Sequence, residues 1–82
     1  MNKKKLLQKI LSNSKNITFD EVVTIIKAFG FELDRVSGSH HIFKRTGIRE
    51  IVNIQNVNGK AKPYQIKQFL TLIERYNLRL EE

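Results

Sequence analysis

The chain has 82 residues and a net charge of +7, from 15 basic and 8 acidic side chains. This length allows one small domain and leaves no room for a second core or a large buried pocket. The absence of cysteine excludes disulfides, thiolate nucleophiles and cysteine-ligated metals. No apolar stretch is long enough to span a membrane, and the apolar run after Lys5 is too interrupted for a signal peptide. We therefore expect a cytoplasmic protein that does not bind membranes.

The positive charge is distributed unevenly along the chain. Residues 1–17 hold five lysines and no acidic residue. A second basic group, in which Glu50 is the single acid, consists of Lys44, Arg45, Arg49, Lys60, Lys62 and Lys67. A basic small domain is typical of proteins that bind polyanions, most often nucleic acid. The alternative is that the lysines only keep a small domain soluble.

The first predicted elements are two helices. Residues 3–12 can form a short helix with its apolar side chains on one side, and residues 13–16 are predicted to be a loop. Thr18 to Glu21 has the pattern of a capping box, which begins a second helix. The apolar stripe of that helix consists of Phe19, Val22, Val23, Ile26 and Phe29, and Gly30 is placed to end it.

Three short strands should follow the second helix. Residues 31–36 and 40–45 flank a Ser-Gly turn, and residues 48–55 form the third strand after a Thr-Gly turn. Strands with such short links form an antiparallel meander. After a polar loop, Pro63 is suited to the first turn of a last helix. The apolar stripe of this helix consists of Ile66, Phe69, Leu70, Ile73 and Tyr76.

Both histidines of the chain, His40 and His41, lie in the second predicted strand. Histidine titrates near neutral pH and is therefore the first candidate for proton transfer. Adjacent strand residues point to opposite faces, so at least one of the two is structural or simply solvated. A metal site with Asp34, or a catalytic triad through Ser39, would need a coincidence of geometry, because the sequence has no metal-ligand or nucleophile motif. We predict neither a metal nor a cofactor.

RNA hydrolysis needs few catalytic groups. The 2′-hydroxyl of RNA is an internal nucleophile, a neutral histidine can take its proton, and lysine or arginine can stabilise the charge that develops on the phosphate. One histidine beside Lys44, Arg45 and Arg49 meets this minimum without a metal. DNA lacks the 2′-hydroxyl and would be left intact.

These features resemble the HicA toxins, small mRNA interferases whose fold is similar to that of double-stranded-RNA-binding domains. The resemblance rests on the element order αβββα and on three sequence elements: Gly30-Phe31, Gly38-Ser39-His40-His41, and Lys62-Pro63 followed by Ile66. It covers about residues 18–77. The Gly-Ser-His element is fairly specific for this family, whereas the Lys-Pro helix start alone is weak evidence for it.

The resemblance implies an α+β fold of the αβββα type, with a three-stranded antiparallel sheet covered by helices on one face. It divides the chain into a basic N-terminal extension of residues 1–17, expected to form a short additional helix, a HicA-like domain of residues 18–77, and a tail of residues 78–82. The extension departs from the common pattern, as does Tyr64, which stands where a small residue is common.

The implied function is that of a toxin in a type II toxin–antitoxin system, a metal-independent endoribonuclease that cleaves mRNA. In HicA toxins the histidine of the Gly-Ser-His element is catalytic, and this position is His40. The implied protein partner is a HicB-like antitoxin that blocks the active site. The predicted RNA contacts are Ser39, Lys44, Arg45, Arg49, Lys60 and Lys62. A non-catalytic RNA-binding module of the same fold, in which His40 contacts phosphate, is the alternative, and a protein-interaction module using residues 1–17 is a third.

Overall fold

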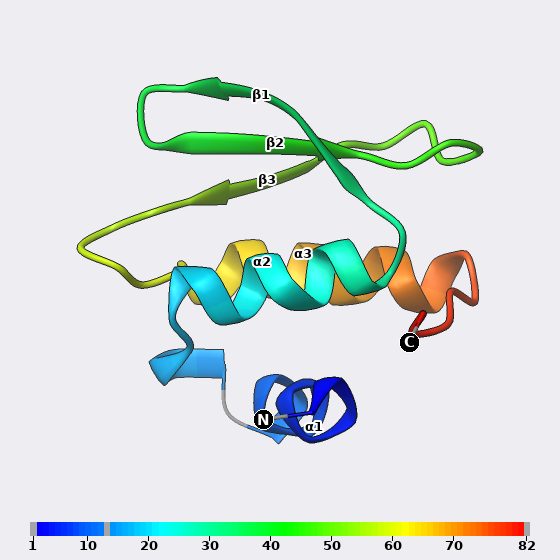
Figure 1. The fold of residues 1–82 in the computed structure, drawn as a ribbon, viewed down its shortest axis with the longest axis horizontal. Coiled ribbons are helices and arrows are strands. Elements are labelled where there is room, and N and C mark those ends of the chain that lie inside the picture. Colours follow the sequence, from blue (N-terminus) through cyan, green and yellow to red (C-terminus); the bar gives the residue numbers. More distant parts are fainter. Residues whose placement is uncertain (1, 13, 82) are drawn as a thin grey trace.

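The computed structural model describes residues 2–12 and 14–81, and its elements follow the predicted order (Figure 1). The elements are α1 (Lys3–Ser12), the short 3₁₀ helix η1 (Ser14–Asn16), α2 (Phe19–Ala28), β1 (Glu32–Ser37), β2 (His40–Lys44), β3 (Val52–Gln55) and α3 (Pro63–Arg75). The predicted α+β fold, αβββα with an additional N-terminal helix, is confirmed. Parts of the predicted extension and tail, namely Met1, Asn13 and Glu82, lie outside the described residues. Within the described ranges, none of the helices has the length and apolar character that a membrane span requires.

Local sequence explains where α2 begins and ends. The Thr18 hydroxyl accepts a hydrogen bond from the Glu21 N–H at 3.1 Å, and the Glu21 carboxylate accepts one from the Thr18 N–H at 3.0 Å. The predicted capping box is therefore present. At the other end, Gly30 has a φ of 88° and donates its N–H to the Lys27 carbonyl. This left-handed conformation favours glycine and turns the chain from α2 into β1.

The sheet is an antiparallel meander in the order β1-β2-β3. Phe43 pairs with Val52 and His41 pairs with Ile54, so these four residues share one face of the sheet. Phe43, Val52 and Ile54 belong to the hydrophobic core, which identifies this face as the one that the helices cover. All residues of the edge strand β1 are exposed, and β1 is the strand that lies farthest from the helices in Figure 1.

The molecule has three layers: the sheet, then α2 and α3, then α1 on the side away from the sheet (Figure 1). The ten apolar residues of the two predicted helix stripes are all buried or half-buried. The core also contains residues that the helix stripes did not identify: Leu6, Ile10, Ile17, Ile25, Phe31, Phe43, Val52, Ile54, Ala61 and Leu72. Leu6 and Ile10 come from α1, so the extension contributes to the same core as the rest of the chain.

Two segments differ from the sequence prediction. Residues 14–16, predicted to be a loop, form the 3₁₀ helix η1. The third strand was predicted to begin at Ile48 but begins at Val52. Gly47 has a φ of 88°, and the Ile48 N–H donates to the Arg45 carbonyl, so the chain turns here instead of extending. The segment after α3 is non-helical but remains attached to the domain: Leu78 and Leu80 pack against the core, and the Glu81 N–H donates to the Ala28 carbonyl at 2.7 Å.

Candidate active site

A two-residue hairpin turn places the Gly-Ser-His element at one end of the sheet. Ser37 pairs with His40, so Gly38 and Ser39 form the turn, and Gly38 adopts a φ of 59°. The Asn56 N–H donates to the Ser39 carbonyl at 3.1 Å. The turn is thereby attached to the end of β3, with Ser39 exposed and His40 as the first residue of β2.

The two histidines lie on opposite faces of the sheet. The His41 ring contacts the Phe19 ring on the helix-covered face, with 4.6 Å between centroids and 59° between planes. Its Nδ1 is 3.2 Å from the Ser39 carbonyl oxygen. His40 lies on the other face, where its Nδ1 is 3.0 Å from Oδ1 of Asn53. His40 thus has its ring on the face that the helices leave free, whereas His41 packs between β2 and the start of α2.

A group of amides that the sequence analysis missed surrounds the turn. Gln65 of α3 is only 3% exposed, and its Oε1 accepts the Gln55 backbone N–H at 2.7 Å. Gln65 Nε2 donates a hydrogen bond to Gln55 Oε1 at 3.3 Å, and Gln55 Nε2 donates one to the Ser39 hydroxyl at 3.4 Å. The available sequence signal was the alternation of Asn53 and Gln55 with apolar residues in β3, which places both amides on the face of His40.

Three of the predicted RNA contacts lie at the same end of the sheet as His40. Figure 1 shows the β1–β2 turn and the β3–α3 loop at this end, together with the start of α2. Ser39 is in the turn, and Lys60 is exposed in the loop, where it pairs with Thr18 just before α2. Lys62 is half-buried at the N-cap of α3, with its Nζ 6.0 Å from the centre of the Tyr64 ring.

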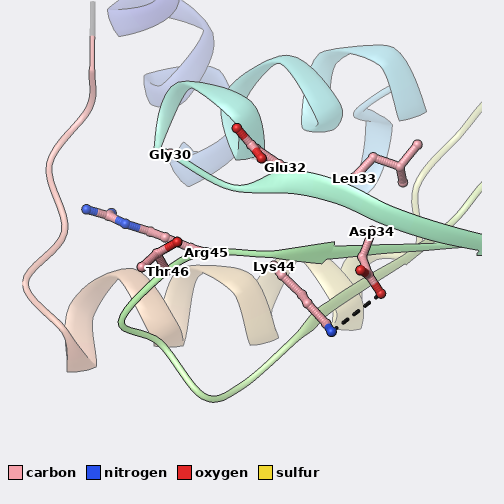
Figure 2. A pocket seen from close by; sticks show the side chains of 7 residues that line it. All are labelled: Gly30, Glu32, Leu33, Asp34, Lys44, Arg45 and Thr46. Atoms are coloured by element: carbon pink, nitrogen blue, oxygen red, sulfur yellow. Dashed lines mark ion pairs between the residues drawn. The ribbon is translucent and has the colours of Figure 1, made fainter.

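The other three predicted RNA contacts follow toward the far end of β2. Lys44 is four residues from His40, about 13 Å along an extended strand. It pairs with Asp34 at 3.6 Å across β1 and β2, as the dashed line in Figure 2 marks. The Arg45 guanidinium donates to the Phe29 carbonyl at 2.8 Å, and Arg49 is exposed in the β2–β3 loop. Arg45 therefore also has a structural partner at the end of α2.

A hollow of about 440 Å³ lies at this far end (Figure 2). It is lined by Gly30, Glu32, Leu33, Asp34, Lys44, Arg45 and Thr46. The lining carries two acidic and two basic side chains, so its charges balance. Neither histidine lines it, and the candidate catalytic residue is therefore separate from this hollow.

Comparison with known protein families decides the classification. The model of a family described as the HicA toxin of bacterial toxin–antitoxin systems matches residues 19–74. The chain belongs to the HicA toxin family. Because HicA proteins are the toxins of toxin–antitoxin pairs, membership implies an antitoxin partner. No curated protein and no solved structure gives a significant match.

The HicA match includes every residue of the candidate site and leaves out α1 and η1. In this HicA protein, α1 covers the side of α2 and α3 that faces away from the sheet. Leu6 and Ile10 are buried there, and Lys9 forms an ion pair with Glu21 of α2 at 2.7 Å. The extension therefore lies across the helices from the histidine face.

Proposed function

We propose that this HicA protein is a metal-independent endoribonuclease that cleaves mRNA, with His40 as the general base. The observation that carries the proposal is the position of the His40 ring. It lies on the sheet face that the helices leave free, at the first residue after the turn, and at the end of the sheet where the loop that contains Lys60 begins. His41, in contrast, packs on Phe19.

The proposed reaction is an internal transfer at phosphorus. His40 takes the proton of a ribose 2′-hydroxyl, and the 2′-oxygen forms a bond to the adjacent phosphorus. The bond from phosphorus to the 5′-oxygen of the next nucleotide breaks, and this oxygen takes a proton from solvent water. The protonated His40 returns its proton to the solvent before the next cleavage. The products are a 2′,3′-cyclic phosphate and a 5′-hydroxyl, so no metal-bound water is needed as nucleophile.

The RNA is proposed to run along β2. Ser39, Lys60 and Lys62 would contact the phosphates beside the cleaved bond and stabilise its developing charge. Lys44, Arg45 and Arg49 would contact phosphates further along, since Lys44 is about 13 Å from His40 along the extended strand. Lys44 would exchange its ion pair with Asp34 for a phosphate.

The antitoxin partner is proposed to be HicB-like and to block the His40 face. In this view residues 18–77 form the toxin domain, which acts in the cytoplasm, where mRNA is found. Residues 1–17 are a separate extension, and residues 78–82 are a tail.

The test is RNA cleavage by purified protein in EDTA. The wild type should cleave single-stranded RNA, and His40→Ala should fold normally, bind RNA with unchanged affinity and lose about 10²–10⁴ in rate. Melting curves on the same preparations control for folding. If the wild type binds RNA but does not cleave it, the protein is a non-catalytic RNA-binding module, and the enzymatic proposal is wrong.

A further inference from the structure

The ring of His40 has a partner with no role in the steps proposed above. His40 Nδ1 and Asn53 Oδ1 are 3.0 Å apart. Asn53 pairs with Ile42 in the β2–β3 register, so its side chain lies on the His40 face and reaches the ring diagonally. An amide oxygen accepts hydrogen bonds and cannot donate them. With Oδ1 of Asn53 facing the ring, as in the structure, a hydrogen bond at this distance has its proton on Nδ1 of His40.

The position of this proton determines the chemistry of the other ring nitrogen. A neutral imidazole has one N–H, so a proton on Nδ1 leaves a free lone pair on Nε2. We infer that Asn53 is a positioning residue, which holds His40 in the Nδ1–H tautomer and presents Nε2 as the proton acceptor. This inference rests on the proposed function, because it assigns the atom of His40 that acts as the base.

The surroundings of Asn53 support a role beyond packing. Asparagine is depleted in strands, yet Asn53 stands between Val52 and Ile54, which are both buried in the core. The apolar neighbours fix the backbone of β3 at this point. Gln55, two residues later on the same face, bonds to Ser39 beside His40. Together these contacts fix the position of the Asn53 amide relative to the His40 ring.

The partner of His40 is uncharged, and this suits a base. The register places three charged side chains on this face, Glu32 and Arg35 of β1 and Lys44 of β2. Glu32 is opposite Lys44, at the end of β2 away from His40, and Arg35 and Lys44 form ion pairs with Asp34 at 2.9 and 3.6 Å. The other strand neighbours of His40, Ser37 and Gln55, are uncharged. A carboxylate in place of the amide would also accept from Nδ1–H but would favour the protonated ring. The amide orients the ring without this bias toward the protonated form.

The tautomer can be measured without any RNA. Nitrogen-15 NMR of the full-length protein at a pH where the ring is neutral should show the His40 proton on Nδ1. Asn53→Leu removes the acceptor and should shift the ring toward the Nε2–H form, whereas Asn53→Asp should retain Nδ1–H. Asn16→Leu, the same substitution at an exposed position of η1, should change nothing. A wild-type proton on Nε2, or a tautomer that Asn53→Leu leaves unchanged, would overturn the inference.

Kinetics then separate positioning from stability. Asn53→Leu should lower kcat by about 10- to 100-fold, as is typical when a functional histidine loses an orienting partner. KM should stay constant because Asn53 acts through His40. Asn53→Asp should recover most of kcat, with the acid limb of its pH profile moved to higher pH. If Asn53 had a purely structural role, Asn53→Leu and Asn53→Asp proteins with equal melting temperatures would have equal kcat. That result would contradict the inference.

The two proposals fail in different ways. A wild-type protein with the expected tautomer but without RNA cleavage would refute the endoribonuclease and leave the Asn53–His40 assignment standing. An active enzyme in which Asn53→Leu shifts the tautomer at unchanged kcat would refute the positioning role alone.

Discussion

His40 and His41 are adjacent in the chain but have different surroundings. The strand period predicts that they point to opposite faces, and the structure bears this out. Which of them packs against the helices could not be predicted from the sequence, because this depends on the register of β2 with β3 and on the position of Phe19. The amides of Asn53 and Gln65 were missed for the same reason, since their partners are more than nine residues away in the chain.

The ring contact of His41 leads to the first prediction. His41→Ala should lower the free energy of unfolding by about 0.5–1.5 kcal/mol, because it removes an aromatic pair with Phe19. Cleavage by the folded fraction should remain within a few-fold of the wild type. Thermal melts and RNA cleavage on one preparation measure both quantities. A well-folded His41→Ala protein without cleavage would reassign the catalytic histidine.

A second prediction concerns Glu21. The hydrogen bond from Lys9 and, next, the backbone bond from Thr18 hold the Glu21 pKa below its ordinary value of 4.5. A carboxyl group with a lowered pKa in the folded state stabilises that state above its unfolded pKa, and this stabilisation is lost as the pH falls through the folded pKa. Glu21→Gln should therefore cost about 0.2–1 kcal/mol at pH 7, the range of exposed ion pairs. The difference should shrink as the pH falls below 4.5 and through the lowered pKa of Glu21.

Urea unfolding of the wild type and of Glu21→Gln between pH 3 and pH 7 measures the difference in their free energies of unfolding. Glu74→Gln, on the exposed side of α3, is the control. A constant difference across this pH range would show that the ionised form of Glu21 contributes nothing to stability.

Among the elements, the helices were predicted most accurately. Their signals are local: the capping box at Thr18, Gly30 after α2, and Pro63 at the first position of α3. The strands were harder to predict, because an apolar residue between the turns of the sheet does not always belong to a paired strand. Ile48 packs against the core from a turn, and Ile51 is 45% exposed. In β1 the alternation of apolar and acidic residues defines no buried face, since every residue of this edge strand is exposed.

The burial pattern of α1 provides the third prediction. Ile10 is 1% exposed in the core, whereas the adjacent Leu11 is 62% exposed. Ile10→Ala should therefore cost about 2–5 kcal/mol. Leu11→Ala, the same kind of truncation one residue later, should cost less than about 0.5 kcal/mol, as is usual at the surface. Hydrogen exchange adds an independent measurement: random-coil exchange of the amides of residues 5–11 would show that α1 is not docked.

For the whole molecule, the question is which surface binds RNA. The structure separates the lysines of α1 from the candidate site by the layer of α2 and α3 (Figure 1). Net charge alone does not show whether RNA binds at α1 or at the candidate site, because both surfaces are basic. The sequence could identify the basic groups but not their separation, which results from how the helices and the sheet pack.

Three double variants with the same change in charge distinguish the surfaces. Removing two phosphate contacts should flatten the log–log salt dependence of single-stranded RNA binding by about 1.4, at about 0.7 for each contact. We expect this for Lys60→Gln with Lys62→Gln, and for Lys44→Gln with Arg49→Gln. The control pair, Lys4→Gln with Lys5→Gln on α1, should keep the wild-type slope. An equal effect of all three pairs would show that RNA does not distinguish the candidate site from the surface of α1.

The most direct test of His40 as the base uses an oligodeoxynucleotide that contains a single ribose. Cleavage by the wild type in EDTA should occur only after the ribose and leave a 2′,3′-cyclic phosphate and a 5′-hydroxyl, because only this sugar supplies a nucleophile. His40→Ala, shown by its melting curve to be folded, should leave the oligonucleotide intact. Cleavage at this ribose by His40→Ala at the wild-type rate, or cleavage of the all-deoxy strand by the wild type, would contradict the account.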